Sequence, residues 1–494
     1  MLHRLTIGRH HASRCRRHTT VTRVPQLWAS RPNLGPLSRR GMQRKPARVR
    51  YSARMRISVI GCGYLGAVHA ASMAELGHTV VGVDVDARKV ELLSQGKAPF
   101  FEPGFEEILR RNVEAGRLSF TTDYGAIAGA QVHFIGVGTP QSETGAANLT
   151  YVNAAIEGML PHLGQCTDGP EVVAGKSTVP VGTAARLAEQ VAPTGVTLVW
   201  NPEFLREGFA VKDTLDPDRM VYGLPDDERA AADAQAVLDE LYRPIIEAGK
   251  PRLVMDYQTA ELVKISANAF LATKISFINA MAQICDAAGA DVTALAGAIG
   301  LDDRIGKRFL RAGIGFGGGC LPKDIRAFQA RANELGVGES LGFLAEVDKV
   351  NDAVRHSVVD TARGLLGEDL AGKRVAILGA AFKPDSDDMR NSPALDLAEE
   401  FVGLSASVVV MDPAAGPILA DREGLPYQVA DSIEEALTGA DVVVLGTEWK
   451  QFTTFDPAKA AELVARRIVI DGRNALPRED WKAAGFTYAG IGRR

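Results

Sequence analysis

The segment GFGGGCLPKD, residues 315–324, places reactive side chains inside a glycine-rich stretch. Cys320 directly follows three glycines and precedes Pro-Lys-Asp. A structural cysteine normally packs among apolar neighbours, whereas these glycines remove side-chain bulk and would let a ligand approach the backbone. Lys323 supplies a positive charge and Asp324 a candidate base. The segment therefore predicts a thiol held in a binding site for chemistry.

A second motif, RISVIGCGYLGAVHAASMAELGHTVVGVD at residues 56–84, has the pattern of a dinucleotide-binding unit. Apolar residues 57–60 predict a strand, and small residues over 67–76 predict a helix that faces a sheet. Between them the turn reads G-x-G-x-x-G, with Gly61, Gly63 and Gly66. Such glycines permit a tight turn and close approach of a pyrophosphate, which the helix N-terminus then favours.

The acid at the end of the second strand bears on which dinucleotide binds. Asp84 closes the run TVVGVD, where a carboxylate can bind the ribose 2′-hydroxyl, so NAD is favoured over NADP. Arg88 and Lys89 weaken that preference, because a cation there can accept a 2′-phosphate. Cys62, inside the turn, is interpreted as a small space-filling residue.

Three further strands are predicted to end in polar residues. The segments are 132–140 (ending Thr-Pro), 171–184 (with Ser177-Thr178) and 196–208 (with Asn-Pro-Glu). Any one of these could be a helix cap or a turn. Three in succession favour a ligand site, because ligands of open α/β sheets bind at the carboxyl ends of the strands.

A long helix is predicted from Tyr257 to Gly289, where apolar residues recur at three- and four-residue spacing. Glu261, Lys264 and Asn268 share one face of it. Considered alone, Lys264 is interpreted as a surface lysine with its stem on apolar neighbours. Cys285 falls within the apolar stripe and is expected in the core.

The last third of the chain returns to an α/β pattern. Strand signals occur within 374–401, 406–413, 440–449 and 467–474, without the full glycine fingerprint. We therefore predict an α/β protein with two Rossmann-like doubly wound domains joined by a long central helix. The cysteine segment would lie between them, in a cleft that holds the cofactor and a substrate.

The net charge of −4 conceals a strongly basic N-terminal segment. Residues 1–54 hold 13 Arg, one Lys and no acid, which leaves 42 basic against 60 acidic residues, or −18, over 55–494. A nucleic-acid arm or a transit peptide is one interpretation. We favour a disordered leader or an over-extended start, because the segment lacks periodicity and MRISVIGCG begins at Met55 as many nucleotide-binding enzymes begin.

Composition excludes several classes of protein. No apolar run reaches the roughly 18 residues needed to span a bilayer. The five cysteines, at 15, 62, 166, 285 and 320, show no paired spacing, so a reducing compartment is expected rather than a disulfide framework. No His, Cys, Asp or Glu cluster has metal-ligand spacing, and no metal is predicted.

Six motifs in order carry a resemblance to a known family. They are GCGYLG, STVPVGT, NPEFLREG, ELVKISANAF, GFGGGCLPKD and FKPDSDDMRNSP. Together they closely resemble the UDP-glucose 6-dehydrogenases, within the UDP-glucose/GDP-mannose dehydrogenase family, over residues 55–494. That family oxidises a primary alcohol to a carboxylate with two NAD⁺ in sequence. Such an oxidation passes through an aldehyde, which a thiolate can hold as a thiohemiacetal and then as a thioester.

The resemblance implies a role for each catalytic residue. Cys320 would be the nucleophile, helped towards thiolate by Lys264 and Lys323. Lys264 and Asn268 would stabilise the C6 oxyanion, and Lys264 could also act as the base of the first oxidation. Thr178 and Asp324 would position a water, and Glu203 would assist thioester hydrolysis.

The resemblance also implies two sets of binding residues. The NAD set is Gly61, Gly63, Tyr64, Leu65, Gly66, Asp84, Lys89, Thr139, Thr178, Glu207, Lys323 and Arg390. The sugar-nucleotide set is Phe204, Leu205, Arg206, Glu207, Lys264, Asn268, Arg304, Phe309, Leu310, Arg311, Ala312, Gly313, Gly317 and Lys383. Arg304 resembles an arginine that reaches the partner subunit's substrate in a dimer.

From these observations we expect a cytoplasmic, homodimeric enzyme of UDP-glucuronate and polysaccharide biosynthesis, with no nucleic-acid or membrane partner. The predicted parts are a leader (1–54), an NAD-binding domain (55–254), a central helical dimerisation region (255–355) and a UDP-sugar-binding domain (356–494). GDP-mannose or another nucleotide sugar is the alternative substrate. A non-catalytic sensor of NAD and nucleotide sugar is a remote alternative, because Cys320 and Lys264 are both present.

Overall fold

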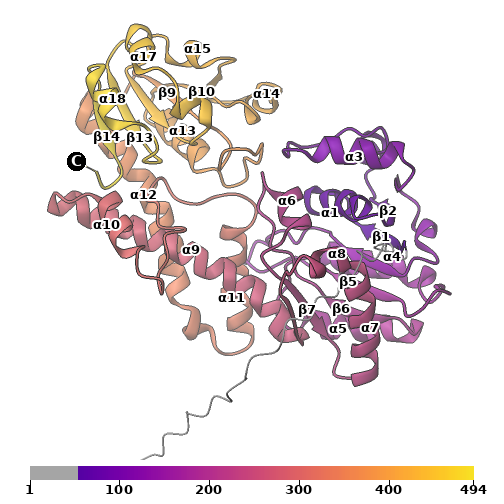
Figure 1. The fold of residues 1–494 in the computed structure, drawn as a ribbon. Coiled ribbons are helices and arrows are strands. Elements are labelled where there is room, and N and C mark those ends of the chain that lie inside the picture. Colours follow the sequence, from indigo (N-terminus) through magenta and orange to yellow (C-terminus); the bar gives the residue numbers. More distant parts are fainter. Residues whose placement is uncertain (1–53, 494) are drawn as a thin grey trace, which may run out of the picture. The chain divides into compact units, whose positions relative to one another are not determined.

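The structure is a computed structural model that describes residues 54–493 (Figure 1). Apart from Arg54, the predicted leader lies outside the described residues.

The first part of the chain forms an eight-stranded sheet in the order β3-β2-β1-β4-β5-β6-β7-β8. All neighbouring strands are parallel except β6 and β7, which pair antiparallel. The strands are β1 (Arg56–Ile60), β2 (Thr79–Val83), β3 (Leu118–Thr121), β4 (Val132–Ile135), β5 (Val172–Gly175), β6 (Thr197–Trp200), β7 (Met220–Leu224) and β8 (Arg252–Asp256). The predicted strand before the glycine turn is therefore confirmed, with one added residue.

Helices connect these strands. They are α1 (Tyr64–Glu75), α2 (Ala87–Ser94), α3 (Phe105–Glu114), α4 (Thr150–Met159), α5 (Thr183–Val191), α6 (Ala210–Leu215), α7 (Glu228–Leu241) and α8 (Arg243–Glu247), with short 3-10 turns at Tyr124–Ile127, Leu160–His162 and Ala192–Thr194. Helix α1 begins three residues before the predicted start at Ala67, because Gly63 serves as its extended N-cap. The turn into α1 is therefore tighter than the sequence pattern suggested.

The second sheet has six parallel strands in the order β11-β10-β9-β12-β13-β14. They are β9 (Arg374–Leu378), β10 (Ser407–Met411), β11 (Gln428–Val429), β12 (Val442–Leu445), β13 (Ile468–Asp471) and β14 (Thr487–Gly490). The connecting helices are α13 (Pro393–Gly403), α14 (Ala415–Ala420), α15 (Ile433–Leu437), α16 (Lys450–Thr453), α17 (Pro457–Leu463) and α18 (Arg478–Ala483). In each sheet the order of the strands reverses beside the first strand, which is β1 in the first sheet and β9 in the second. This doubly wound order confirms the predicted α/β fold class.

Long helices lie between the two sheets in the sequence. Helix α9 (Tyr257–Ala288) begins where Asp256 caps the backbone N–H of Thr259 and ends at Gly289, which has a left-handed φ of 70°. Helices α10 (Val292–Ile299), α11 (Leu321–Glu334) and α12 (Phe343–Leu366) follow, with a 3-10 turn at Gly338–Leu341. The predicted long helix is confirmed at both ends, because the sequence carries its N-cap, Asp256, and the glycine that ends it, Gly289.

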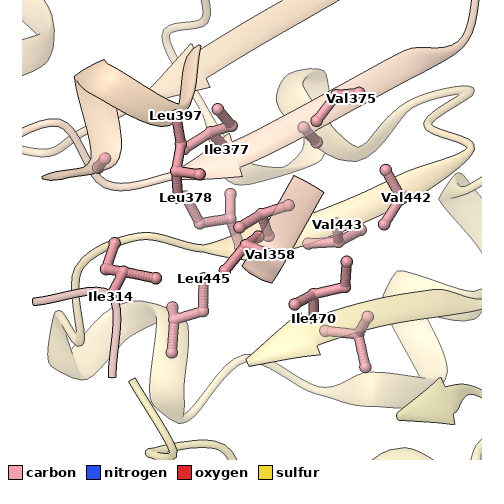
Figure 2. Packing of buried hydrophobic residues seen from close by; sticks show 14 of the residues in the cluster. Ile314, Val358, Val375, Ile377, Leu378, Leu397, Val442, Val443, Leu445 and Ile470 are labelled. Carbon is pink, nitrogen blue, oxygen red and sulfur yellow. The ribbon is translucent and has the colours of Figure 1, made fainter. Parts of the chain in front are cut away.

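The core of the second sheet also anchors the start of the cysteine segment. Ile314, which directly precedes the segment, is fully buried, and so is Val358 of α12. Both pack with residues of β9, β12 and β13, including Ile377, Leu445 and Ile470 (Figure 2). Burying side chains of this size contributes about 1.5–3 kcal/mol each. The residues just before Cys320 are therefore fixed to the second sheet. Cys285 and Cys62 are buried, as expected.

Candidate active site

Cys320 lies immediately before the first turn of α11 and is exposed to solvent. Lys323 and Asp324 are on that first turn, because Pro322 suits the start of a helix. Gly315 and Gly318 have left-handed φ values, which glycine adopts without strain. These two turns lead the chain to Cys320, directly before α11.

Asp324 is buried and joined to α9. Its Oδ2 accepts a hydrogen bond of 2.6 Å from Nδ2 of Asn268, and its Oδ1 accepts one of 2.5 Å from Nζ of Lys323. Asp324 is 1% exposed and Asn268 8% exposed, so this pair has little contact with water. The structure therefore brings together the predicted oxyanion amide and the predicted water-positioning carboxylate.

Lys264 is buried on the same face of α9, so its interpretation as a surface lysine is wrong. Its Nζ lies 2.9 Å from Oε1 of Glu203, and its side chain is 7% exposed. Burial opposes the ammonium form, but the charges of Glu203, Cys320 and Asp324 outweigh it and raise the pKa of Lys264 above its ordinary value. The lysine is therefore held as an ammonium group beside the thiol.

The Cys320 thiol is not a preformed thiolate. Although it is exposed, the protein packed around it raises its pKa to about 11, and Asp324, Glu203 and Glu207 add to the rise while Lys264 opposes it. Lys323 instead pairs with Asp324. The predicted help from Lys264 is present but smaller than the effect of burial. At neutral pH the sulfur therefore carries its proton, which must leave when the sulfur attacks.

We expect alkylation of Cys320 by iodoacetamide to accelerate about tenfold per pH unit from pH 7 to 10, because only the thiolate reacts. Burial raises the pKa of an acid, so the thiolate fraction keeps rising up to about pH 11. Peptide mass spectrometry at each pH measures the rate. Lys264→Met should slow alkylation at pH 8, since Lys264 lowers the thiol pKa. A plateau below pH 9 would contradict this account.

The glycines before Cys320 make room for protein rather than for a ligand, which corrects the sequence interpretation. A Cβ at Gly317 would lie 2.1 Å from the carbonyl oxygen of Asn391, and one at Gly319 would lie 2.2 Å from the Arg390 guanidinium. At Gly318 it would meet the Phe382 ring at 2.8 Å. The run is bare because the 382–391 segment after β9 packs directly on it.

We expect Gly317→Ala to lower the midpoint of thermal unfolding and to reduce turnover. The added methyl must displace the 382–391 segment, and overpacking of this kind costs about 1–3 kcal/mol. Differential scanning fluorimetry and a steady-state assay measure the two effects. The matched control is Gly297→Ala in α10, where a Cβ meets no atom within 4 Å. Equal midpoints for the two variants would show that the close approach is not limiting.

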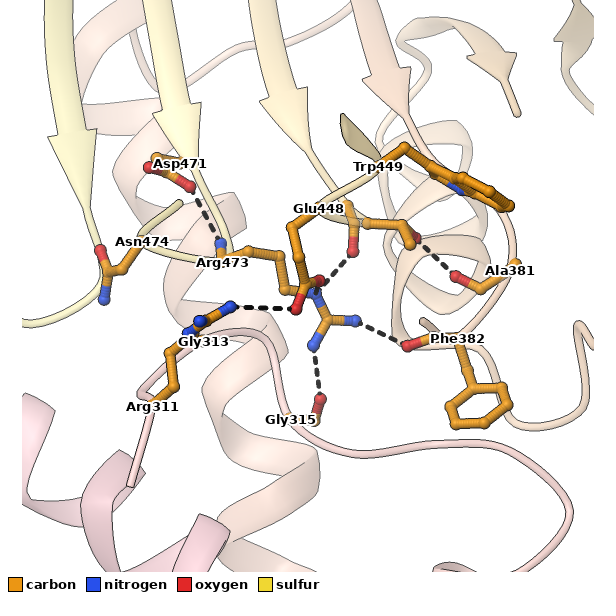
Figure 3. A network of polar contacts seen from close by, with 12 residues as sticks. Arg311, Gly313, Gly315, Ala381, Phe382, Glu448, Trp449, Asp471, Arg473 and Asn474 are labelled. Atoms are coloured by element: carbon orange, nitrogen blue, oxygen red, sulfur yellow. Dashed lines mark hydrogen bonds and ion pairs between the residues drawn. The ribbon is translucent and has the colours of Figure 1, made fainter. Parts of the chain in front are cut away.

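Arg473, after β13, clamps the cysteine segment to the second sheet (Figure 3). Its guanidinium donates to the carbonyl oxygens of Gly446 at 2.7 Å, Gly315 at 2.9 Å and Phe382 at 3.2 Å. Its Nε also lies 3.7 Å from Glu448. Sequence reasoning missed this residue, although its place directly after a strand in DGRN was an available signal. Arg473 holds both loops that frame Cys320.

The predicted substrate loop contributes Glu203 and the residues after it. Phe204 lies beneath the Lys264 ammonium, 5.6 Å from it, and beneath the Arg219 guanidinium at 3.9 Å. The backbone N–H of Leu205 donates to Glu203 Oε2 at 2.5 Å. Arg206 is exposed and forms an ion pair of 2.7 Å with Asp213. The loop therefore presents an aromatic face and a carboxylate to the Lys264 side of the site.

Glu207 links this loop to the segment after β9. Its Oε1 lies 3.3 Å from Arg390 Nη2, and its backbone carbonyl accepts from Lys383 Nζ at 2.7 Å. Burial and the nearby Asp388 carboxylate raise the pKa of Glu207 to about 7, although Lys383 and Arg390 act to lower it. Burial lowers the pKa of Lys383 despite Glu207. Three residues predicted to bind ligands therefore form one charged cluster.

The remaining predicted substrate residues lie before the cysteine segment. Phe309 has a left-handed φ of 63° and is exposed, whereas Leu310, Ala312 and Gly313 are buried. Arg311 is exposed and pairs with Glu448 at 3.3 Å, beside the Arg473 clamp. Arg304 is exposed and pairs with Asp302 on its own loop. Arg311 is therefore joined to the Arg473 clamp, whereas Arg304 pairs within its own loop.

The first glycine turn fits a dinucleotide. A Cβ at Gly66 would lie 1.8 Å from the carbonyl oxygen of Gly61, so α1 can pack on the turn only with glycine there. A Cβ at Gly63 meets no atom within 4 Å, and the N-terminus of α1 has no side-chain cap. The turn therefore presents free backbone N–H groups to open space, as a pyrophosphate requires.

Asp84, predicted to bind the ribose, directly follows β2 and accepts hydrogen bonds from three groups. Its Oδ2 accepts from the backbone N–H of Cys62 at 2.7 Å, and its Oδ1 accepts from that of Asp86 at 3.0 Å. Lys89 Nζ donates to both carboxylate oxygens, at 3.3 and 3.2 Å. With the two backbone donors it fills the roughly four acceptor positions of the carboxylate, so a ribose hydroxyl would have to take the place of Lys89.

The loop that carries Thr178 is tied to both sides. The Thr139 hydroxyl donates to the Thr178 carbonyl oxygen at 2.8 Å. Further along, Glu261 of α9 accepts from the backbone N–H groups of Gly182 at 2.7 Å and Ala184 at 2.6 Å, at the start of α5. Burial raises the pKa of Glu261 to about 7. The face of α9 that carries Lys264 and Asn268 therefore also holds this loop.

Comparison with known proteins gives consistent matches. Residues 55–246, 258–353 and 376–478 match the NAD binding, central and UDP binding domains of the UDP-glucose/GDP-mannose dehydrogenase family. The UDP-glucose 6-dehydrogenase YwqF of Bacillus subtilis is 41% identical over 89% of this chain and 98% of its own length. The UDP-glucose 6-dehydrogenase of Rhizobium meliloti is 40% identical over 89% of this chain and all of its own.

A solved structure agrees. The UDP-glucose dehydrogenase of Pyrobaculum islandicum matches with a TM-score of 0.81 and 37% identity, over 90% of this chain and 99% of its own. Matching domain models, relatives near 40% identity and the doubly wound fold lead to the same conclusion. The chain belongs to the UDP-glucose/GDP-mannose dehydrogenase family, whose members are NAD-dependent nucleotide-sugar dehydrogenases.

Proposed function

We propose that this protein oxidises the C6 hydroxymethyl group of UDP-glucose to a carboxylate, which yields UDP-glucuronate. The observation that carries this proposal is the grouping of an exposed thiol with the Lys264–Glu203 ion pair and the Asn268–Asp324 hydrogen bond. A thiol beside an ammonium and an amide is suited to trap an aldehyde and stabilise its oxygen. The similarity to proteins named UDP-glucose 6-dehydrogenase supports UDP-glucose as the substrate.

NAD⁺, bound twice in sequence, supplies the hydride acceptor for both oxidations. In the first, C6 loses a hydride and the hydroxyl loses its proton to give the aldehyde. The Cys320 sulfur then adds to C6, and the thiol proton passes to the aldehyde oxygen. Loss of a second hydride from C6 and of the hydroxyl proton gives a thioester. Water attacks its carbonyl carbon and the C–S bond breaks. One proton of that water goes to the sulfur and the other to solvent, so that the carboxylate is released.

Each polar residue has a role in these steps. The Lys264 ammonium and the Asn268 amide donate to the C6 oxygen as negative charge develops on it. The raised pKa of Lys264 favours this role over that of a base in the first oxidation. Asp324, with Thr178, positions water for that first proton. Glu203 assists attack on the thioester, because its carboxylate lies beside Lys264.

We assign the two binding sets predicted above to their ligands. NAD binds on the 61–66 turn, Asp84 and Lys89, with Thr139, Glu207, Lys323 and Arg390 towards the nicotinamide. The sugar nucleotide binds between the 204–207 loop and the 309–317 segment, with Lys383 beside it. The Glu207–Lys383–Arg390 cluster supports this assignment, since it borders both Cys320 and the glycine run.

The test is the number of NADH molecules formed per UDP-glucose consumed, measured by absorbance and product chromatography. We expect about two, because the trapped aldehyde gives up a second hydride before release. Inert UDP-glucose with two NADH per GDP-mannose would keep the chemistry and change the substrate. Inertness with every nucleotide sugar, despite NAD binding, would identify a sensor and contradict the proposal.

The exposed face of α9 supports a homodimer. Phe270, Phe277 and Ile284 lie seven residues apart and are 66%, 48% and 62% exposed. A stripe of that spacing runs along one side of a helix and is buried when a second copy packs against it. In such a dimer Arg304 would reach the partner's substrate.

We expect Phe277→Glu to convert a dimer into a monomer, as measured by light scattering after size-exclusion chromatography. The charge would be buried without a partner at the centre of the interface. Phe343→Glu is the control, because Phe343 is similarly exposed at 53% but lies on α12. A wild-type monomer would contradict the assembly.

We also propose that the protein functions in the cytoplasm. Cys62, Cys166, Cys285 and Cys320 are all free thiols, which suits a reducing compartment. Among residues 54–493, no helix is long and apolar enough to cross a membrane.

A further inference from the structure

Glu102 is a buried carboxylate that the proposed chemistry does not use. It lies between α2 and α3 and is 6% exposed. A carboxylate is kept in such a place only when hydrogen bonds replace its lost hydration. Its partners come from two other segments of the chain, and both belong to ligand sites.

The first partner is the end of the substrate loop. Glu102 Oε2 accepts from the backbone N–H of Gly208 at 2.6 Å, and Oε1 accepts from that of Ala210 at 2.7 Å. These groups stand where the loop that carries Glu203 to Glu207 enters α6. One side chain therefore fixes the exit of that loop at two backbone donors that lie two residues apart.

The second partner is the cofactor turn. The Tyr64 hydroxyl donates to the same Glu102 Oε2 and accepts from the Gly208 N–H at 3.1 Å. Tyr64 follows Gly63 directly and opens α1, whose N-terminus faces the dinucleotide. The tyrosine ring packs on Phe100, 4.8 Å between centroids, which fixes its direction.

The same region contacts the segment after β9. The backbone N–H of Phe101 donates to Asp387 Oδ2 at 2.9 Å. Gly208 has a left-handed φ of 75°, and a Cβ there would lie 2.7 Å from the carbonyl oxygen of Asp385. The substrate loop is thus held between Glu102 on one side and the segment with Lys383 and Arg390 on the other.

We propose that Glu102 is a positioning residue that fixes the 203–208 loop for the nucleotide sugar and ties it to the cofactor turn through the Tyr64 hydroxyl. It touches neither the reacting atoms nor the thiol. It follows that removal of the Tyr64 hydroxyl, although Tyr64 lies in the NAD turn, weakens binding of the sugar nucleotide. This proposal rests on the proposed function for the identity of that ligand.

The test uses Glu102→Gln and Tyr64→Phe in the full chain. Calorimetry with UDP-glucose and no NAD gives the dissociation constant without turnover, and steady-state assays give KM for each substrate. The control is Glu107→Gln, which makes the same chemical change on the exposed face of neighbouring α3, where Glu107 pairs with Arg111.

We expect Glu102→Gln to raise the dissociation constant of UDP-glucose tenfold or more, because an amide NH₂ group faces a backbone donor that it cannot accept from. Its KM for NAD should stay within twofold. Tyr64→Phe should raise the UDP-glucose constant about fivefold, the effect of one hydrogen bond near 1 kcal/mol. The double variant should lose less than the two single losses combined, because the tyrosine hydroxyl and the carboxylate hold the same Gly208 N–H and bond to each other.

Two results would overturn the proposal: UDP-glucose constants within twofold of wild type in both variants, or losses confined to thermal stability. If Glu102→Gln does not fold, Tyr64→Phe decides alone. Wild-type protein that fails to bind UDP-glucose contradicts the proposed function instead. Hydrogen exchange then tests Glu102 without a ligand, through the amides of Gly208 and Ala210. Both should exchange at least tenfold faster in Glu102→Gln, and at the wild-type rate if the proposal is wrong.

Discussion

Cys320→Ser should lower the overall rate of UDP-glucuronate formation on the order of 10³-fold, because removal of a nucleophile removes the step that it starts. A serine hydroxyl has a far higher pKa than a thiol, and its ester is a poorer acyl donor than a thioester. The variant should therefore stall before release of the acid. NADH formed per sugar, with chromatography of the products, measures both the loss and the stage at which it occurs.

Cys166→Ser is the control for this substitution, since Cys166 is a free thiol on the loop before β5. It should keep two NADH per UDP-glucose and the wild-type rate. The decisive comparison is the product: a Cys320→Ser enzyme that still releases UDP-glucuronate at more than a tenth of the wild-type rate would remove the thioester from the mechanism. Binding of NAD should be unchanged, because the cofactor turn lies on the first sheet.

The fold, and the placement of several candidate site residues on one face of α9, could be predicted from the sequence because their signals are local. The signal of the G-x-G-x-x-G turn is local, since Gly61 has a left-handed φ of 86° and a Cβ at Gly66 would lie 1.8 Å from the carbonyl oxygen of Gly61. The signals for helix α9 are local as well, because Asp256 caps its start and Gly289 ends it, each directly beside the helix in the sequence. For the same reason, Glu261, Lys264 and Asn268 could be placed on one face.

What the sequence could not indicate depends on contacts between distant segments. The glycines before Cys320 suggested room for a ligand, but the space is filled by Phe382, Arg390 and Asn391, more than 60 residues away. Lys264 looked like a surface lysine because its partner Glu203 lies on a different strand loop. Arg473 and Glu102 were missed for the same reason: a buried charge is identified by its partners, and those are set by tertiary structure.

Lys264→Met should lower kcat by about 10²–10³-fold, the usual loss when a donor to a developing oxyanion is removed. The methionine keeps the length of the side chain and loses the charge. The Cys320 thiol should also become harder to ionise, because Lys264 lowers its pKa. Steady-state assays across pH 6–10 measure the effect. Lys349→Met, an exposed lysine on α12 paired with Glu346, is the control and should keep wild-type activity.

The pH profile distinguishes the two roles of this lysine. Carboxylates and the thiol raise the pKa of Lys264 above its ordinary value of 10.5, so the ammonium persists through the neutral range. An oxyanion donor must be protonated, so activity should show no rise from loss of the Lys264 proton below pH 10. Single-turnover oxidation in a Cys320→Ser background removes the thiol from this test. There, a limb that rises towards pH 9 and disappears on addition of Lys264→Met would instead identify the lysine as the base.

The Glu203 carboxylate and the Lys264 ammonium are buried together, so the loss of one charge affects the other. Lys264→Met leaves the Glu203 carboxylate without its cation, and breaking one side of a buried pair costs about 3–5 kcal/mol of stability. The double variant Lys264→Met/Glu203→Gln removes both charges and should recover most of the thermal stability. It should recover none of the activity, since the oxyanion donor and the hydrolytic carboxylate are both gone. Stability and catalysis therefore separate within one pair of residues, which a purely structural ion pair would not allow.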